Sequence, residues 1–363
     1  MRNDRLGLAM ALAMAVACQR GEPGSSRAEA DSLPPTASSA RAGEPVLLAY
    51  VTNEGSEELS VIDTRTDTVV ASIPVGTRPR GVLLAPDGRT IFVALSGSPR
   101  CPPTMPDEEC EKLKADKTKD GIALVDAATR KVVRVLPGGS DPETFDISRD
   151  GSTLFVSNED AGVATVVDVA SGKISTTVKV GTEPEGVRVQ PGGNVVWVTG
   201  ESAHNVTLID TRTGKLLGSI EVGQRPRSLD FTPDGKRAYV ASEVDGTVWV
   251  IDVGARKALK VIPMPTDSKP MDVVVSPDGR RVYVSNGRGG TVSVIDPSTD
   301  SVITSVPVGQ RPWGIALTPD GGRLYTANGP SNDVSVVDTK NLTVTRKIPV
   351  GKLPWGVAIG QAP

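Results

Sequence analysis

The chain has 363 residues, of which 38% are hydrophobic and 23% charged, and its net charge is −3. A chain with an isoelectric point of about 5.5 offers no broad basic surface to a phosphate backbone, so nucleic acid is a disfavoured partner. The length alone would suggest two or three domains of about 150 residues each, but an internal repeat replaces that estimate with one array.

The first residues predict an export signal. A short basic segment, 1–5, precedes an apolar run of 12 residues, Leu6–Ala17, which is too short to span a bilayer as a helix. The run ends in Ala15-Val16-Ala17-Cys18, which resembles a bacterial lipobox. That resemblance implies a signal peptide over 1–17, a lipid on Cys18 and, because Gln19 follows, an outer-membrane lipoprotein facing the periplasm or the cell surface. An ordinary signal peptide cleaved nearby is the alternative.

Residues 18–45 predict a flexible tether. They consist mainly of Ser, Ala, Pro and Gly with scattered charges, and such a composition cannot bury a core. We therefore expect the tether to link a membrane anchor to the folded part of the chain.

From Val46 to Gly360 the sequence repeats one pattern. A clean copy, Gln310–Gly351, holds four short runs rich in Val, Ile and Tyr and bounded by turn residues, which is typical of strands. An aspartate ends the third run of each copy, at successive spacings of 63, 42, 42, 42, 44 and 42 residues. Four-stranded units of roughly 40–45 residues are typical of propeller blades. The aspartates, which we expect to accept backbone N–H groups of the next turn, are Asp63, Asp126, Asp168, Asp210, Asp252, Asp296 and Asp338.

The second run of the repeat carries a Tyr-Val-Thr-Asn phrase. Clear copies are Tyr50–Asn53, Phe155–Asn158, Tyr283–Asn286 and Tyr325–Asn328. Together with VSVID-like third runs and IPVG-like fourth runs, they resemble the YVTN β-propeller repeat family. The resemblance implies an all-β fold of four-stranded antiparallel blades. It implies little about function, since such propellers serve as surface-layer proteins, secreted binding proteins and electron-transfer enzymes.

The order of the runs predicts how the ring closes. The repeat region starts on a second run, Val46–Asn53, and ends on a first run, Gly356–Gly360. We therefore predict a seven-bladed β-propeller over 46–360, in which the C-terminal strand joins the N-terminal blade and removes the open sheet edges. Strand alternation places the PDG turns on one face. It places the blade-to-blade linkers and the loops after the second strands on the other face.

The single long spacing marks an insertion, 98–120, on the face that carries the linkers, where variable loops often bind partners. Residues Pro106–Lys117 begin with acids and end with lysines, which predicts a helix capped by Thr104 over part of the channel mouth. With Cys18 assigned to lipid, Cys101 and Cys110 are expected to form a disulfide in an oxidising compartment. A metal site is the alternative, although the chain contains one histidine.

Each linker contains a proline whose neighbours should surround the mouth of the central channel. Two adjacent linkers are acidic, the next is doubly basic, and the last two place tryptophans side by side. This mouth suits a polar organic ligand or a peptide segment, although solvated charges and packing tryptophans need no ligand. The ligand-binding candidates are Arg80, Asp141, Glu143, Glu183, Glu185, Arg225, Arg227, Lys269, Arg311, Trp313 and Trp355.

Signatures of catalysis are scarce. The sequence has no C-x-x-C-H and no G-x-S-x-G motif, and its only histidine, His204, falls in a loop where we expect it to be exposed. No catalytic residue, metal or cofactor is therefore assigned. We expect an envelope-anchored binding or scaffold protein that engages a protein or a small polar ligand. The alternative is a propeller enzyme, either a metal-dependent, lactonase-like hydrolase using carboxylates such as Asp141 and Glu143 or a subunit of a redox system.

Overall fold

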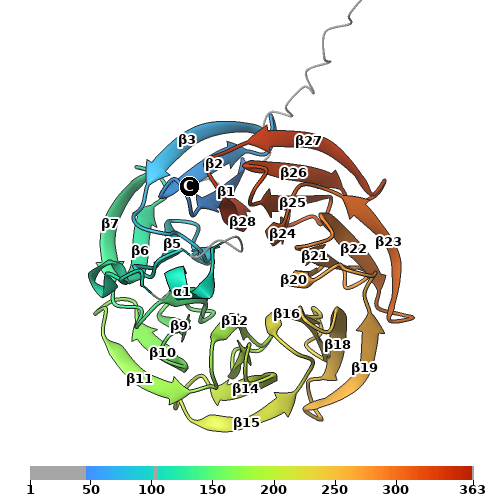
Figure 1. The fold of residues 1–363 in the computed structure, drawn as a ribbon, viewed down its shortest axis with the longest axis horizontal. Helices are drawn as coiled ribbons and strands as arrows, with labels where there is room; N and C mark the ends of the chain where they lie inside the picture. The colour runs from blue at the N-terminus through green and yellow to red at the C-terminus, as the bar shows by residue number, and fades with distance from the viewer. Residues whose placement is uncertain (1–45, 101–104, 111, 362–363) are drawn as a thin grey trace, which may run out of the picture. The chain divides into compact units, whose positions relative to one another are not determined.

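The described residues fold into an all-β propeller. The computed structural model describes residues 46–100, 105–110 and 112–361. Within them, 28 strands form seven four-stranded antiparallel sheets arranged as blades around a central axis (Figure 1). The predicted fold class and blade number are confirmed. No helix in these residues is long and apolar enough to cross a membrane.

The strands occupy four positions in each blade, from the channel to the rim. The innermost strands are β28 (Pro354–Gln361), β4 (Val82–Leu84), β8 (Pro142–Ile147), β12 (Pro184–Val189), β16 (Pro226–Phe231), β20 (Pro270–Val275) and β24 (Pro312–Leu317). The second strands are β1 (Leu47–Asn53), β5 (Thr90–Leu95), β9 (Thr153–Asn158), β13 (Val195–Gly200), β17 (Arg237–Ser242), β21 (Val282–Asn286) and β25 (Arg323–Asn328). The third strands are β2 (Glu58–Asp63), β6 (Gly121–Asp126), β10 (Val163–Asp168), β14 (Asn205–Asp210), β18 (Thr247–Asp252), β22 (Thr291–Asp296) and β26 (Asp333–Asp338). The outer strands are β3 (Thr68–Pro74), β7 (Lys131–Leu136), β11 (Ile174–Lys179), β15 (Leu216–Glu221), β19 (Lys257–Pro263), β23 (Ser301–Pro307) and β27 (Thr343–Pro349).

Blade 1 is built from both ends of the described chain. Its sheet has the order β28-β1-β2-β3, and β28 pairs antiparallel with β1, for example Leu48 with Gly360 and Tyr50 with Ala358. This pairing is the predicted ring closure. In Figure 1 the red end of the chain accordingly lies beside the blue β1. Blades 2 to 7 follow in chain order, from β4–β7 to β24–β27.

Burial explains why the repeat has its apolar pattern. Second and third strands are buried along almost their whole length because they pack against neighbouring blades on both faces, whereas most outer-strand residues face solvent. The core is therefore a series of inter-blade layers, such as the one that joins Trp197 to Phe231 with ring centroids 5.2 Å apart. Burial of such apolar layers is the main stabilising term in a structure of this kind.

In four of the seven blades, the hydroxyl of the YVTN phrase ties the blade to the next. Thr52 donates to the carbonyl of Arg80 at 2.6 Å, and Ser157 donates to that of Glu185 at 2.6 Å. Equivalent bonds join Thr199 to Arg227 and Ser285 to Trp313. The repeat phrase thus fixes the backbone of residues that we predicted at the channel mouth.

The asparagine of the phrase and the third-strand aspartate are structural too. Asn53 donates to Ser60 at 2.9 Å, and Asn328 donates to Ser335 at the same distance. The seven aspartates each accept a backbone N–H of the following turn at 2.7–2.9 Å, which confirms their predicted role.

The insertion differs from its prediction. The helix expected over Pro106–Lys117 is wrong in length: the described residues form one short helix, α1 (Asp107–Cys110), and a separate 3-10 helix at Lys117–Lys119. So short a segment gains too few backbone hydrogen bonds to propagate. Asp120 holds the base of the insertion, accepting from the N–H groups of Gly97 and Asp141. Cys101 and Thr104 lie outside the described residues, and so does the predicted disulfide.

Candidate functional site

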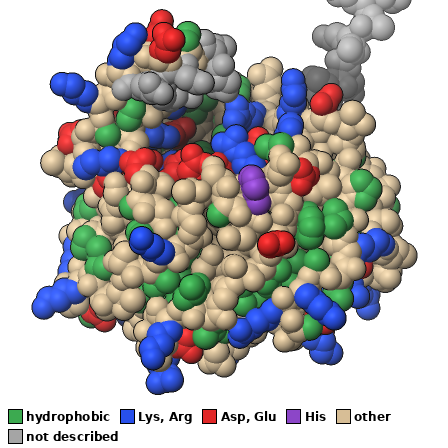
Figure 2. Space-filling view, turned by 60° about the horizontal axis from the view of Figure 1, so that its bottom comes forward, with side chains coloured by type: hydrophobic (Ala, Val, Ile, Leu, Met, Phe, Trp, Pro, Cys, Tyr) green, Lys and Arg blue, Asp and Glu red, His purple; other side chains and the backbone are tan. Residues whose placement is uncertain are grey.

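The candidate site is a cavity of about 700 Å³ at the mouth of the central channel, on the face that carries the linkers. Its wall includes Ser98, Pro99, Arg100 and Ala115, so the described part of the insertion borders it as expected. Figure 2 shows acidic and basic side chains gathered along this face. His204 is exposed, as predicted. We refer to this space as the mouth cavity.

One backbone conformation recurs in all seven linkers. The residue before each linker proline has a positive φ of 44–57°, which non-glycine residues seldom adopt. Its occurrence in every blade shows that it belongs to the repeat. The residues are Arg78, Asp141, Glu183, Arg225, Lys269, Arg311 and Leu353.

Most of the predicted site residues meet at the mouth cavity. Exposed Glu183 does not line it and accepts a hydrogen bond from Ser202, whereas Lys269 lines a neighbouring groove. The residues that line the cavity are Arg80, Asp141, Glu143, Glu185, Arg225, Arg227, Arg311, Trp313 and Trp355.

Arg80 is the centre of a buried ion-pair cluster. Its side chain is 4% exposed and contacts Asp141 at 2.5 Å, Glu159 at 3.3 Å and Glu143. Burial would lower the pKa of Arg80, but the surrounding carboxylates raise it. Burial raises the pKa of Glu143 well above its usual range. Arg80 opposes this shift, whereas the negative charges of Glu159 and Asp141 add to it. These groups are not an ordinary solvated rim.

Arg227 forms a second cluster, across the mouth from the insertion. Its side chain is 9% exposed and pairs with Glu185 at 2.8 Å, with Glu201 and, at 3.7 Å, with Glu243. Arg225 contacts Glu201 at 2.7 Å. Burial raises the pKa of Glu185 well above its usual range, against the opposing effect of Arg227. Paired charges of this kind hold their side chains in one geometry.

The two tryptophans predicted to lie side by side do so. Trp313 and Trp355 stack with ring centroids 5.8 Å apart and planes 23° from parallel. The guanidinium groups of Arg311 and Arg227 lie 4.9 and 5.2 Å from the Trp313 ring centroid, within cation–π range. Both indoles border the mouth cavity and the channel below it.

Three glutamates were missed in the sequence. Glu159, Glu201 and Glu243 each follow a second strand directly, as does Glu54, which pairs with Arg78 at 2.8 Å. Aligning the repeats would have shown this shared position. In blades 1 to 7 it is occupied by Glu54, Ser96, Glu159, Glu201, Glu243, Gly287 and Gly329.

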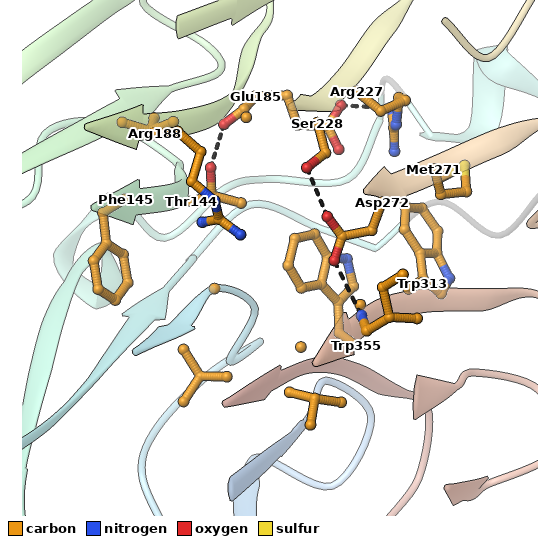
Figure 3. A pocket seen from close by; sticks show the side chains of 18 residues that line it. Thr144, Phe145, Glu185, Arg188, Arg227, Ser228, Met271, Asp272, Trp313 and Trp355 are labelled. Carbon is orange, nitrogen blue, oxygen red and sulfur yellow. Dashed lines mark hydrogen bonds and ion pairs between the residues drawn. The ribbon is translucent and has the colours of Figure 1, made fainter. Parts of the chain in front are cut away.

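Below the mouth, a channel cavity of about 100 Å³ runs between the innermost strands (Figure 3). Asp272 lines this cavity. Asp146, Asp230 and Asp272, all on innermost strands, accept the backbone N–H groups of Val189, Val275 and Ile315 in the next blade, at 2.7–3.0 Å. Because innermost strands of neighbouring blades do not pair, these carboxylates satisfy edge amides. Burial raises the pKa of Asp230 to about 6, with Arg188 opposing the shift. The main role of this acidic set is structural.

The carboxylates do not form a metal site. No group of three or more His, Cys, Asp or Glu side chains in the described residues has an arrangement that could hold a metal ion. Asp141, Glu143 and Glu185 are instead each paired with an arginine. The carboxylates that we considered for a metal-dependent, lactonase-like site thus form ion pairs with Arg80 and Arg227.

Comparisons with known proteins show the same fold. A family model described as a lactonase, 7-bladed beta-propeller, matches residues 218–352, and a YNCE-like beta-propeller model matches 108–193. Antigen Lp49 of Leptospira interrogans (serogroup Icterohaemorrhagiae, serovar copenhageni, strain Fiocruz L1-130) is 28% identical over 109 residues, which is 30% of this chain and 22% of that protein. The match thus spans less than a quarter of this relative's length.

Two solved structures illustrate the structural likeness. A candidate 6-phosphogluconolactonase from Bacteroides fragilis NCTC 9343 superposes with a TM-score of 0.72 at 18% identity, covering 88% of this chain and 99% of that one. Hydrazine synthase of Kuenenia stuttgartiensis gives a TM-score of 0.67 at 21% identity, covering 80% and 92%. At such identities the likeness concerns the fold alone.

Proposed function

We propose that this protein is a binding propeller that holds a polar ligand or a segment of a partner protein in the mouth cavity. The observation that carries the proposal is the cavity itself, about 700 Å³ lined by charged side chains and two stacked tryptophans. Concave sites of this size with a few fixed polar groups are typical of ligand binding.

Rigidity of the walls supports this proposal. Arg80 and Arg227 are held by buried ion pairs, and the YVTN hydroxyls fix the backbone carbonyls of both residues. A ligand that enters such a site has little side-chain motion to suppress, so less free energy is lost on binding. The described part of the insertion, 98–120, borders the same cavity and would add contacts from a segment that no other blade has.

The proposal includes the cell envelope as location. In it, the chain is a lipoprotein of the YVTN type whose Cys18 carries the lipid and whose tether, 18–45, presents the propeller at the outer membrane. The support is the sequence pattern before Cys18. Replacing Cys18→Ser should release the protein from washed membranes into the soluble envelope fraction, and unchanged membrane association would refute this part.

A propeller enzyme is the second candidate. Two observations favour it: the lactonase model matches 218–352, and burial raises the pKa of Glu143 and Glu185, as is common for acid–base groups in active sites. The metal-dependent form of this candidate does not fit the described carboxylates. A catalytic role would require one of these glutamates to leave its arginine partner.

Native mass spectrometry of the protein purified gently from the cells that make it tests the binding proposal. We expect a stoichiometric small molecule or protein partner, and Trp313→Ala should weaken its binding about 30-fold, as for an aromatic hot-spot residue. The control is Val133→Ala on the exposed rim, which should have no effect. A ligand that dissociates equally from both variants would place binding outside the mouth cavity.

A further inference from the structure

Arg225 and Arg311 occupy the same position in two linkers, with the Lys269 linker between them, but have different partners. Arg225 pairs with Glu201 of the blade before it at 2.7 Å and with Glu243 of its own blade at 3.4 Å. The corresponding positions around Arg311 are Gly287 and Gly329. Within the described residues, no carboxylate lies within 4.0 Å of the Arg311 guanidinium.

The uncompensated charge of Arg311 has a cost in the folded protein. Burial lowers the pKa of Arg311, and the neighbouring Arg227 and Arg225 lower it further. The more distant carboxylates of Glu243 and Glu54 oppose this shift without reversing it, so the charged form remains destabilised. Stacking on Trp313 offsets part of this cost. An anion beside Arg311 would offset the rest.

A groove of about 660 Å³ opens beside Gly287, one of the two glycines that replace glutamate. It is lined by Gly287, Gly289, Gly290 and Gly309, and it shares Arg311 and Pro330 with the mouth cavity. We name it the glycine groove.

The glycine groove carries an excess of positive charge. Lys269, Arg288 and Arg311 line it, and none of them has an ion-pair partner in the described part of the chain. The Lys269 ammonium donates to the carbonyl of Val244 at 3.1 Å. The one acid of the wall, Glu243, is within 3.4 and 3.7 Å of Arg225 and Arg227, so its charge is already compensated.

We infer that the ligand carries an anionic group, a carboxylate or a phosphate, which takes the place of the carboxylate absent from blades 6 and 7 and binds Arg311 and Lys269, with Arg288 at the edge. This deepens the proposed function, on which it rests, by naming the chemical class of the ligand. Arginine binds both anions through paired N–H donors. The ligand extends from the tryptophans in the mouth cavity into the glycine groove.

Gly329 offers a direct test. A Cβ atom added there would meet Trp313 at 3.4 Å, which is an ordinary contact, and the residue lacks a positive φ. In Gly329→Glu the chain supplies its own carboxylate to Arg311, which should exclude the anion, whereas Gly329→Gln matches it in size without the charge. Arg311→Gln removes the binding group itself and decides the matter if Gly329→Glu does not fold.

Isothermal titration of the mature full-length protein at low salt, with citrate and pyrophosphate as probes, measures the effect. We expect one-to-one binding of at least one probe, weakened about tenfold or more by Gly329→Glu and by Arg311→Gln but changed less than about threefold by Gly329→Gln. Lys352→Gln removes an exposed cation of the same face outside both cavities and should leave the affinity unchanged. Binding of citrate alone indicates a carboxylate ligand, and binding of pyrophosphate alone a phosphate ligand.

Three results would overturn the inference: no binding of either anion at millimolar concentration, equal loss in Gly329→Glu and Gly329→Gln, or equal loss in Lys352→Gln. Failure of the proposed function gives a different pattern. A natural ligand that is lost in Trp313→Ala but retained in Gly329→Glu keeps the binding proposal and removes the anionic group. Conversely, Arg311→Gln could weaken binding of the probe while Trp313→Ala leaves the affinity for the natural ligand unchanged. That result would support the anion site and contradict the proposal that the natural ligand binds in the mouth cavity.

Discussion

The two sides of the channel mouth use one repeated position in opposite ways. In blades 3 to 5 the residue after the second strand is a glutamate, and Glu159, Glu201 and Glu243 each contact an arginine of a linker. In blades 6 and 7 the same position is glycine, and Arg311 between them has no such partner among the described residues. The comparison shows that the arginines of one side are paired with glutamates of the chain itself. On the other side Arg311 has no such partner, and we propose that the ligand supplies the missing anion.

The paired side should respond most strongly to loss of its cation. In Arg80→Gln, the buried carboxylates of Asp141 and Glu143 lose the guanidinium that compensates them. Breaking such a buried pair typically costs about 3–5 kcal/mol. We expect a loss of that size in the free energy of unfolding, measured by urea titration.

The control is Arg89→Gln, at an exposed turn on the other face, which should change the free energy of unfolding by less than about 0.5 kcal/mol. A loss below about 1 kcal/mol in Arg80→Gln would mean that the cluster is solvated and that the two sides of the mouth do not differ as described.

The channel should make stability depend on pH through Asp230. Its pKa in the folded protein, about 6, exceeds the unfolded value of roughly 4. The folded state therefore binds the proton more tightly, and the contribution of this group is complete below about pH 4 and lost as pH rises through 6. Asp230→Asn cannot ionise, so relative to the wild type it should gain roughly 2 kcal/mol between pH 4 and pH 7, allowing for partial exposure to the channel.

Unfolding midpoints in urea, measured for the wild type and Asp230→Asn across this pH range, check the prediction. An identical pH dependence in both proteins would show that Asp230 is not desolvated. The test also separates the channel from the mouth, because the charge with the largest effect on this carboxyl is Arg188, not Arg80 or Arg311.

Loss of the Asn–Ser hydrogen bond of the repeat should cost the same in blade 1, where Glu54 follows the second strand, as in blade 7, where Gly329 follows it. Ser60 accepts from Asn53 in blade 1, and Ser335 accepts from Asn328 in blade 7, both at 2.9 Å and both fully buried. Ser60→Ala and Ser335→Ala should each lower the free energy of unfolding by about 1 kcal/mol. If thermal or urea unfolding shows that they differ by more than the measurement error, the asymmetry extends beyond the mouth into the blades.

The sequence predicted the fold well because every blade repeats the same local signals. Turn residues, alternating apolar runs and the third-strand aspartates recur at nearly constant spacing. The last apolar run has no further runs after it, so it could only complete the blade begun at the N-terminal end of the repeat. The helix in the insertion failed for the opposite reason. Pro106–Lys117 has no second copy in the chain and no packed apolar face. The helix was predicted from the charges at its two ends alone, and these are too weak to maintain a helix without tertiary packing.

The sequence predicted where the site residues lie but not which acid pairs with which arginine. The linker prolines located Arg80, Arg227 and the tryptophans, because linkers of a propeller converge on one face. Which acid meets which arginine depends on the loop after the second strand, which looked variable. Only the comparison of that loop between blades distinguishes Glu243 from Gly287, and it is this difference that sets apart the two sides of the mouth.

The smallest effect on stability is expected for substitution of Arg311, although the guanidinium groups of Arg311 and Arg227 both lie over the Trp313 ring. Arg227→Gln should cost about 3 kcal/mol or more, because Glu185 and Glu201 lose their buried partner. Arg311→Gln loses stacking on Trp313 but also relieves repulsion from Arg225 and Arg227, so the free energy of unfolding should change by less than about 0.5 kcal/mol. Urea titration of the two variants side by side measures the difference. A large loss in Arg311→Gln would mean that this arginine maintains the fold, whereas a negligible loss is the result that the proposed anion site predicts.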